Sequence, residues 1–402
     1  MAPSTKSGGN TSKRASARGR IYPKTLSAAD GKRLDALYKS MKEDRSRHAG
    51  YPCNMLFDYS ELYRFLEFSM NNVGDPFDDT NFGINTHAIE REMIKFFADL
   101  TGAPEDNCWG YMTSGGTEGN LYGLYLAREL MGKEAIVYFS EDTHYSVPKI
   151  MRLLGTRHIM IRSAPGGEMD CEDLRETVRI HRDRPTIVMA TSGTTMTGAV
   201  DDVEEIRSIL SGLAIKKSYI HCDAALNGMV LPFVDNPPVF GFPLGIDSIA
   251  ISGHKMIGSP LPCGVVLAKR GNVNLIARSI EYVGVLDTTI SGSRSGFAPL
   301  AIWYAVKRYG VKGIRKIVRD SIKLADFAIE KFAQKGIRAW RNPNSLTVVF
   351  PRTSAKVVRK WKLASKDDIS HIITLPHLSR ADIENAVNEI ARDIKKRGGK
   401  KA

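Results

Sequence analysis

The sequence predicts an α/β fold with a mostly parallel central sheet, followed by a smaller α+β carboxy-terminal domain. Three observations support this prediction. Short apolar runs typical of buried strands alternate with amphipathic stretches of helical period. Polar residues gather where several of these runs end, and beyond residue 272 long helical stretches replace the alternation. The length of 402 residues, with 43% hydrophobic and 25% charged, is ordinary for globular proteins and sufficient for two cores.

The elements follow in order along the chain. We expect strands at 135–139, 157–161, 186–190, 219–222, 248–251 and 264–268, with helices between them at 149–154, 171–182 and 203–210. The carboxy-terminal part predicts one long helical stretch from 298 through 308 into 313–336, strands at 347–350 and 372–375, and a helix at 380–396. The expected divisions are a disordered basic tail (1–20), an amino-terminal segment (21–60), a large domain (61–271), a small carboxy-terminal domain (272–390) and a second basic tail (391–402).

Two neighbouring strand candidates end in residues of opposite charge. The strand candidate at 248–251 is followed by Ser-Gly-His-Lys, which ends in Lys255. The candidate at 219–222 is followed directly by Asp223. Open α/β sheets bind ligands where such strands end. A lysine amine can hold the aldehyde of pyridoxal phosphate as a Schiff base, and a carboxylate can keep its pyridine nitrogen protonated. Either residue alone would be an ordinary surface lysine or strand-end carboxylate, but the pair suggests pyridoxal phosphate as cofactor.

A phosphate site is expected at a glycine-rich segment, Thr113-Ser-Gly-Gly-Thr-Glu-Gly-Asn120, which precedes a helical stretch. Its glycines allow close backbone approach, the helix start offers free N–H groups, and Ser114 and Thr117 add hydroxyls. Alone, such a segment is an ordinary turn. His144 follows another strand candidate and could stack on the cofactor ring, although a histidine bound to local backbone groups is the simpler interpretation.

The chain resembles the group II pyridoxal-phosphate amino-acid decarboxylases, and within them it looks most like the bacterial histidine decarboxylases and the similar plant serine decarboxylases. The resemblance extends over residues 50–390 and rests on several blocks. These are Asn72-Val-Gly-Asp-Pro-Phe77, the stretch from Trp109 to Asn120, Asp142-Thr-His-Tyr-Ser-Val147, Ser252-Gly-His-Lys-Met-Ile-Gly-Ser-Pro260, Thr289-Ile-Ser-Gly-Ser-Arg294 and Trp361-Lys-Leu-Ala364. It implies the architecture of fold-type I pyridoxal enzymes and a homodimer or a multiple of one.

The resemblance also implies residue roles. Lys255 would bind the cofactor covalently, Asp223 would pair with the pyridinium, and His144 would stack on the ring and contact the substrate. The remaining cofactor contacts would come from Ala225 beneath the ring, Thr191 near the ring hydroxyl, Ser114, Gly115, Gly116 and Thr117 at the phosphate, and Ser252 and His254 beside it. Tyr282 is a candidate substrate contact and proton donor, with surface packing as the alternative.

One departure from the family pattern concerns the substrate. After Gly-Ser-Arg the family usually continues Asn-Gly-His, whereas this chain has Ser295, Gly296 and Phe297, and Leu286 replaces a usual polar residue nearby. Replacing Asn and His by Ser and Phe removes hydrogen-bonding capacity, which matters in a site that recognises a polar substrate group. The identity of the substrate is therefore left open.

The sequence thus predicts decarboxylation of an L-amino acid to its amine and carbon dioxide, with Lys255, His144 and Asp223 as the catalytic residues. Histidine is the leading substrate, followed by serine or another polar or aromatic amino acid. A pyridoxal-dependent carbon–carbon lyase or aminotransferase would retain the same lysine and aspartate. A different class of alternative is a noncatalytic interaction protein whose basic tails recruit a partner.

The net charge of +13 is concentrated at the two ends: residues 1–20 hold five basic and no acidic residues, and residues 391–402 hold six basic and one acidic. We expect solvated tails and no specific nucleic-acid binding. No stretch is apolar enough to span a bilayer and no secretory signal is apparent. The five scattered cysteines have no metal-binding or disulfide spacing, so we expect reduced thiols, no metal and a cytoplasmic location.

Overall fold

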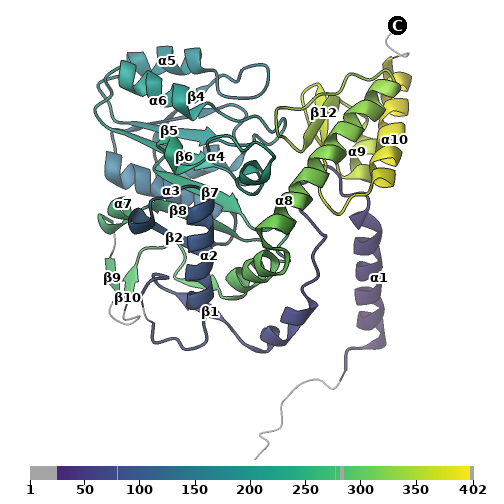
Figure 1. Cartoon of the computed structure of the whole chain (residues 1–402), viewed down its shortest axis with the longest axis horizontal. Coiled ribbons are helices and arrows are strands. Elements are labelled where there is room, and N and C mark those ends of the chain that lie inside the picture. The colour runs from purple at the N-terminus through teal and green to yellow at the C-terminus, as the bar shows by residue number, and fades with distance from the viewer. Residues whose placement is uncertain (1–24, 79, 277, 281–284, 399–402) are drawn as a thin grey trace, which may run out of the picture. The chain divides into compact units, whose positions relative to one another are not determined.

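A seven-stranded sheet is the centre of the part of the chain that the computed structural model describes, residues 25–78, 80–276, 278–280 and 285–398. The strand order is β2-β8-β7-β6-β5-β3-β4 (Figure 1). The strands are β2 (Cys108–Thr113), β3 (Ile136–Ser140), β4 (Arg157–Ile161), β5 (Thr186–Thr191), β6 (Ser218–Asp223), β7 (Ser248–Ser252) and β8 (Gly264–Lys269). Strands β3 to β7 run parallel, whereas β8 is antiparallel to both β7 and β2. The predicted α/β fold is confirmed.

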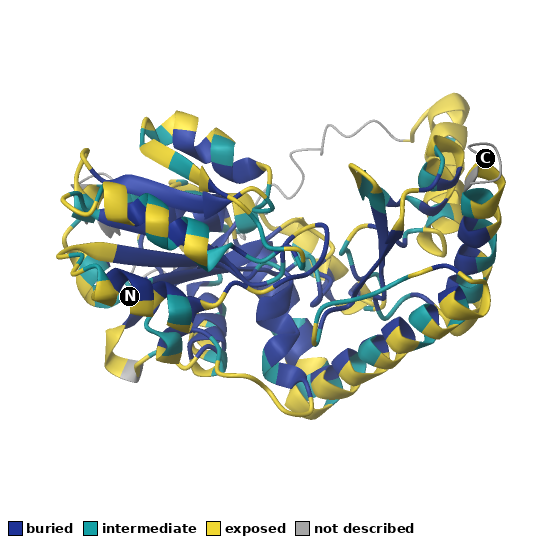
Figure 2. Cartoon of the chain, turned by 90° about the horizontal axis from the view of Figure 1, so that it is seen from above, coloured by how far each residue is buried: buried dark blue, intermediate teal, exposed yellow. Residues whose placement is uncertain are grey.

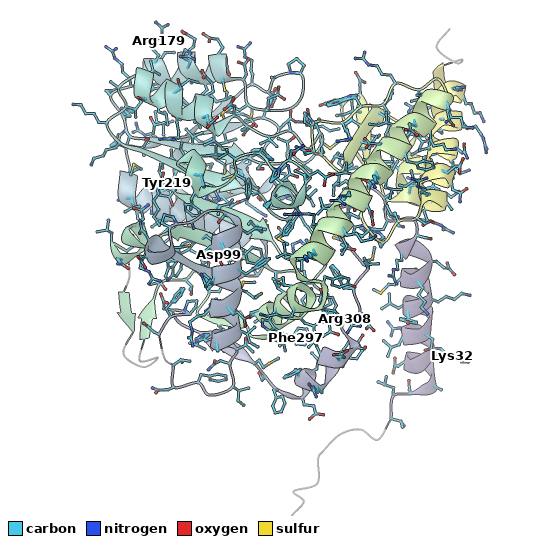
Figure 3. All side chains as sticks on the ribbon, in the orientation of Figure 1. Lys32, Asp99, Arg179, Tyr219, Phe297 and Arg308 are labelled. Atoms are coloured by element: carbon cyan, nitrogen blue, oxygen red, sulfur yellow. The ribbon has the colours of Figure 1, made fainter. Side chains whose placement is uncertain are left out.

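The central strands are apolar runs because helices cover both faces of the sheet. All residues of β3, β5 and β7 are buried, as expected for parallel strands inside an α/β layer. Figure 2 shows these strands in dark blue, with exposed residues on the outer sides of the helices. Two residues illustrate the difference in burial between the sheet and the outer helices. Tyr219 of β6 is buried within the sheet, whereas Arg179 on α5 is exposed (Figure 3).

Strand β2 was absent from the expected set. Its run, Cys-Trp-Gly-Tyr-Met-Thr, is interrupted by Gly110, which lowers the strand signal. The structure explains the glycine, because a Cβ at this position would lie 2.4 Å from the backbone oxygen of Val266 on the adjacent strand β8. The close approach of the β2 and β8 backbones therefore requires Gly110, the same residue that weakens the strand pattern of β2.

The helices follow the alternation with the strands. They are α1 (Ala28–Arg45), α2 (His87–Leu100), α3 (Gly116–Met131), α4 (Ser146–Leu154), α5 (Cys171–Ile180), α6 (Val203–Gly212), α7 (Arg270–Asn274), α8 (Phe297–Gln334), α9 (Ala355–Trp361) and α10 (Arg380–Gly398). Short 3₁₀ helices span Ser60–Glu67, Glu105–Asn107, Asn227–Met229, Leu231–Phe233 and Phe242–Leu244. Among the described residues, 25–44 belong to a unit separate from the rest of the chain, and α1 has no buried residue. No helix among the described residues has the length and hydrophobicity to cross a membrane.

Helix α8 connects the large sheet to a smaller carboxy-terminal layer. The sequence predicts one long helical stretch here, and the structure adds a break within it at Gly310, which has a φ of +59°. The part before Gly310 packs into the main core with residues such as Ile302, and the later part contributes Phe332 to a second core. That core includes the three-stranded sheet β12-β14-β13, made of β12 (Thr347–Pro351), β14 (Ile369–Ile373) and β13 (Ala364–Lys366).

Two short antiparallel pairs complete the described strands: β1 (Asn71–Val73) with β11 (Ser293–Ser295), and β9 (Arg278–Ile280) with β10 (Val285–Asp287). Helix α10 extends through residue 398, so its ordered turns enter the segment expected as a basic tail, and Ala391 is buried in the second core. The amino-terminal tail, residues 1–20, lies outside the described residues. The domain boundaries proposed at residues 61 and 272 stay predictions.

Candidate active site

A cavity of about 310 Å³ lies where β5, β6 and β7 end, beside the first turn of α3. Its lining contains every described residue predicted to bind cofactor: Ser114, Gly115, Gly116, Thr117, His144, Thr191, Asp223, Ala225, Ser252, His254 and Lys255. Further lining residues are Glu118, Asn120, Tyr145, Gly193, Thr195 and Pro262. Tyr282 lies outside the described residues, so its suggested substrate contact stays a prediction. One cavity therefore collects residues from six separate parts of the sequence.

The carboxylate of Asp223 is held at the end of β6 by two donors. Asn120 on α3 donates from Nδ2 to Oδ2 at 2.7 Å, and the backbone N–H of Ala225 donates to Oδ1 at 3.0 Å. His221 in turn bonds through Nε2 to Oδ1 of Asn120 at 3.0 Å and through Nδ1 to Oγ of Ser248 at 2.7 Å. Because an amide oxygen only accepts, Nε2 of His221 carries the proton and Nδ1 accepts from the serine. This chain of bonds directs the Asn120 amide at Asp223.

Close packing of α3 on β6 makes this arrangement possible. A Cβ at Gly123 would lie 2.1 Å from Nδ1 of His221, so a glycine leaves the space that the imidazole occupies. His221 is fully buried, and burial lowers its pKa to about 4 from an ordinary 6.5, although the nearby Asp223 acts in the opposite direction. The imidazole is therefore neutral at neutral pH, which is the form that this chain of hydrogen bonds requires.

The lowered pKa of His221 predicts a specific loss of stability in acid. The unfolded chain protonates this histidine near pH 6.5 and the folded chain only near pH 4, so its contribution is intact above pH 6.5 and is lost as the pH falls toward 4. The difference corresponds to about 3 kcal/mol. Urea unfolding at pH 7 and pH 4 should show the wild type losing about that much more free energy than a His221→Gln variant. Equal losses in both proteins would contradict the assignment.

Lys255 follows β7, and the loop that bears it is fixed by the amino-terminal segment. The backbone N–H of Asn54 donates to the Lys255 carbonyl at 3.0 Å, and Nδ2 of Asn54 donates to the Met256 carbonyl at 2.9 Å. Burial lowers the pKa of the Lys255 amine, while the charges of Asp223 and Cys53 oppose that shift. A lowered pKa increases the fraction of uncharged amine, which is the nucleophilic form that attacks a carbonyl.

His144 lies on the loop between β3 and α4. Its Nδ1 is 2.8 Å from Oγ of Ser146 and accepts from the Ser146 backbone N–H at 3.3 Å, so Nε2 is the nitrogen left to donate to a ligand. Burial lowers the pKa of His144, Asp223 raises it and Lys255 lowers it further, so burial dominates. The loop is also tied to the carboxy-terminal sheet, because Lys366 on β13 forms an ion pair with Asp142 at 2.7 Å.

The expected phosphate site is the turn into α3. Gly115 has a φ of +150°, and a Cβ at Gly116 would lie 2.9 Å from Oγ of Ser252, so both glycines let the backbone approach the cavity. The positive end of α3 and the free N–H groups of its first turn favour an anion here. Opposite this turn, Nδ1 of His254 bonds the Cys263 carbonyl at 2.9 Å and fixes the imidazole in the lining.

Glu118 is a hydrogen-bond partner of one serine that was expected at the phosphate. Its Oε2 accepts from both the backbone N–H of Ser114 at 2.7 Å and the Ser114 hydroxyl at 2.6 Å, while Tyr111 donates to Oε1 at 3.0 Å. The Ser114 hydroxyl lines the cavity but already donates to this carboxylate. Thr117 and Ser252 remain as lining hydroxyls with no recorded hydrogen bond within the described residues.

These features fit pyridoxal phosphate. The cavity offers an amine of lowered pKa, a carboxylate held by two donors, an anion-binding helix start and an imidazole with one nitrogen free to donate. Sequence reasoning had missed Asn120 and His221 as part of this arrangement. The signal available for Asn120 was its place in the glycine-rich block, whereas nothing local marked His221.

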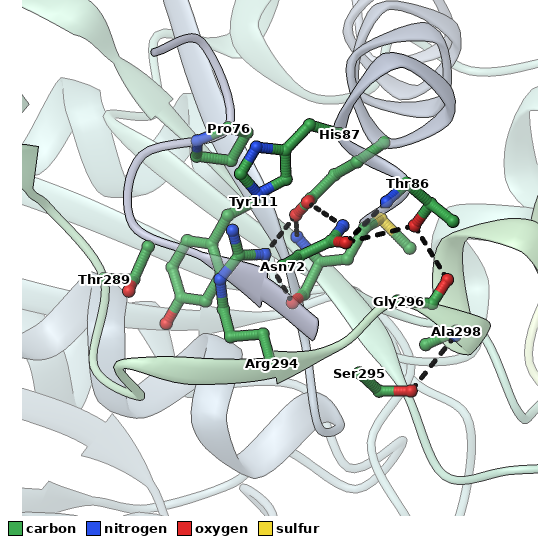
Figure 4. A network of polar contacts seen from close by, with 12 residues as sticks. Asn72, Pro76, Thr86, His87, Tyr111, Thr289, Arg294, Ser295, Gly296 and Ala298 are labelled. Carbon is green, nitrogen blue, oxygen red and sulfur yellow. Dashed lines mark hydrogen bonds and ion pairs between the residues drawn. The ribbon is translucent and has the colours of Figure 1, made fainter. Parts of the chain in front are cut away.

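The segment that departs from the family pattern lies in a different polar network (Figure 4). Arg294 forms a buried ion pair with Glu90 and donates to the Gly74 carbonyl at 2.9 Å. Ser295 Oγ accepts from the Ala298 backbone N–H at 3.2 Å at the start of α8, and Phe297 is buried in the main core. Neither Ser295 nor Phe297 is among the residues that line the active-site cavity of this chain. The side chain of Leu286 lies outside the described residues.

Comparison with known proteins gives concordant results. Residues 84–349 match the family model described as the pyridoxal-dependent decarboxylase conserved domain. The chain is 43% identical over 366 residues to a histidine decarboxylase of Mesorhizobium japonicum, covering 91% of this chain and 99% of the relative. It is 44% identical over 369 residues to a histidine decarboxylase of Pseudomonas entomophila, covering 91% of each. The structure of L-methionine decarboxylase from Streptomyces sp. 590 with L-methionine methyl ester has a TM-score of 0.84 at 26% identity, covering 92% of this chain and 96% of that one.

Proposed function

The chain belongs to the pyridoxal-dependent decarboxylase family, and from that premise we propose that it converts L-histidine to histamine and carbon dioxide. The observation that carries the proposal is the convergence of Lys255, Asp223 and His144 on one polar cavity. Histidine is favoured over methionine because identity to the two histidine decarboxylases is 43% and 44%, against 26% to the methionine enzyme. Ser295 and Phe297, where the chain departs from the family pattern, do not line this cavity within a single chain.

Pyridoxal phosphate is the cofactor, and when bound it supplies a ring that accepts the electrons of the bond broken at the α-carbon. The chain's own residues hold and tune this ring. Lys255 provides the amine that binds it, and Asp223, fixed by Asn120, keeps a positive charge on the ring nitrogen favourable. The start of α3 with Thr117 would hold the phosphate.

His144 is proposed to cover the ring and contact the substrate. Its Nε2 can donate a hydrogen bond to a carboxylate, because Nδ1 is occupied by Ser146. The ion pair between Lys366 and Asp142 limits movement of the loop that carries it. Such positioning favours one orientation of the substrate and therefore the loss of its carboxyl group over cleavage of another bond.

The direct test uses the holoenzyme with histidine, serine and methionine, measuring carbon dioxide and amine by mass spectrometry. We expect histamine and carbon dioxide in equal amounts, with kcat/KM for histidine at least about 10²-fold above the other two. Carbon dioxide from a different amino acid would overturn the substrate. Aldehyde or keto acid without carbon dioxide would favour the lyase or aminotransferase alternative, and no product from any amino acid would favour a noncatalytic protein.

We further propose a homodimer, or a multiple of one, in the cytoplasm. A groove of about 1000 Å³ between the 60–89 region and α8 exposes Phe68, Ile84 and other apolar side chains to solvent. Helix α1, taken by itself, exposes an apolar stripe of Leu34, Leu37, Tyr38 and Met41. Exposed apolar surface of this kind is typical of subunit interfaces. All five cysteines are free thiols, which supports a reducing compartment.

A further inference from the structure

A second cavity, of about 420 Å³, lies behind the active site. It is bounded by the segment after β5, by β6, by the 238–246 loop and by residues 342–344. Thr191 lines both cavities, so they share part of a wall. Val200 and Val239 are exposed at its edge, which gives a small molecule access from solvent. The proposed reaction uses none of the other residues that line this cavity.

The lining is apolar and its only charges are acidic. Val203, Leu231 and Ile246 are buried apolar residues of the wall. Asp201 and Glu168 also line it, whereas no lysine, arginine or histidine occurs among the described lining residues. Within the described part of the chain no ion pair is recorded for either acid. Charge complementarity therefore favours an organic cation with an apolar body over an anion or a neutral polar molecule.

Two buried polar groups give independent support for a ligand. Ser192 is 4% exposed, lines this cavity, and its hydroxyl has no hydrogen-bond partner. Asp201 is also 4% exposed, and its two oxygens each accept one backbone N–H at 2.7 Å, from Met169 and Thr191. Each carboxylate oxygen can accept a second hydrogen bond. A buried hydroxyl without a partner is unfavourable, so the wall of this cavity contains a polar group that the chain itself leaves unsatisfied.

The ionisation of Asp201 fits the same chemistry. Burial raises its pKa to about 7, the two backbone N–H groups lower it, and the nearby Glu168 and Asp142 raise it. Asp142 is itself paired with Lys366, so Glu168 is the unpaired acid that adjoins Asp201 in the cavity. A cation placed between Asp201 and Glu168 would relieve the repulsion between them.

We propose that this cavity binds small amines with an apolar body in their protonated form. The proposal rests on the shape, apolar lining and acidic charge of the cavity. The ammonium would lie near Asp201 and Glu168 and the apolar body against Leu231 and Ile246.

The test uses the holoenzyme and N,N-dimethylphenethylamine, a tertiary amine that is protonated at neutral pH and cannot form an imine with the cofactor. Isothermal titration calorimetry measures its Kd, with 2-phenylethanol as the neutral analogue. We expect saturable binding of one amine per chain and at least about tenfold weaker binding of the alcohol. Equal affinity for both probes would overturn an amine site.

Three variants locate the bound probe. Glu168→Gln removes a charge from a half-buried side chain and should weaken amine binding about fivefold to tenfold. Leu244→Trp fills the cavity from a partly exposed position and should abolish binding. Glu204→Gln, an exposed acid on α6 outside the lining, is the matched control and should bind like the wild type. Unchanged binding in both Glu168→Gln and Leu244→Trp would place the probe elsewhere and overturn the proposal.

Failure of this site can be distinguished from failure of the proposed function. Histidine turnover without added amine should be the same in Glu168→Gln and the wild type, because Glu168 does not line the active-site cavity. If the variants weaken amine binding but histidine is not decarboxylated, the result supports the amine site and contradicts histidine as the substrate. If histidine is decarboxylated but the variants bind the amine like the wild type, the result supports histidine decarboxylation and contradicts the amine site.

Discussion

Replacing Lys255 with alanine is expected to abolish decarboxylation, with kcat falling by about 10³-fold or more. Lys255 is the one lysine among the described residues that line the active-site cavity, and the lowered pKa of its amine favours the nucleophilic form. Without this amine, the cofactor has no covalent attachment to the chain. The measurement is carbon dioxide release, together with the visible absorbance of cofactor retained after dialysis, and both should be lost.

A separate readout identifies the attachment without relying on activity. Borohydride reduction of the wild type followed by peptide mass mapping should find the cofactor on Lys255, and the Lys255→Ala variant should carry none. Lys149→Ala is the matched control, because Lys149 is an exposed lysine on α4 outside the cavity lining. Circular dichroism should show that both variants fold. Turnover retained in the folded Lys255→Ala protein would refute the role of this residue.

The main strands could be predicted because parallel strands covered on both faces must be apolar throughout. The runs that became β3, β5 and β7 are fully buried and carry the signal along their whole length. β2 is equally buried, but the close contact with β8 requires Gly110, and this tertiary requirement weakened the local pattern. Strand propensity depends only on the residues of β2 itself, whereas Gly110 is required by the backbone of β8, which is distant in the sequence.

The meeting of Lys255 and Asp223 could be predicted for a similar reason. Their strands, β7 and β6, are adjacent and parallel, so their carboxyl ends fall at the same edge of the sheet. The contact between Asn120 and Asp223 joins residues 103 positions apart on a helix and a strand. It depends on how α3 sits on the sheet, which Gly123 and His221 decide through close packing. No periodicity or spacing in the sequence encodes that fit.

Two interpretations from the sequence gain a further contact in the structure and stay predictions. The Ser114 hydroxyl was expected to face a phosphate, but Glu118, one turn further along, accepts its hydrogen bond. Ser295 and Phe297 were interpreted as changes in a substrate site, yet one accepts a bond at the start of α8 and the other packs in the core. In each case the residue type is compatible with both roles, and the sequence alone does not show which side chains lie beside it.

Asp223→Asn is expected to separate cofactor attachment from catalysis. The substitution preserves the size of the side chain but removes the charge that favours a protonated ring nitrogen, so we expect kcat to fall by about 10²-fold or more. Lys255 remains, and the cofactor should therefore stay bound and absorb visible light. KM should change much less than kcat, because the lost interaction acts on the reacting state more than on substrate binding.

Asn120→Ala provides the graded comparison for this prediction. It leaves the Asp223 charge in place but removes the 2.7 Å hydrogen bond that orients the carboxylate, so kcat should fall by about tenfold. The double variant should be no slower than Asp223→Asn alone, because Asn120 acts through that carboxylate and the two effects are not additive. Additive losses would mean that Asn120 contacts the cofactor or substrate independently. Wild-type rates in Asp223→Asn would mean that a different group holds the ring nitrogen, since a carboxylate that carries this role cannot be neutralised without cost to the electron-accepting ring.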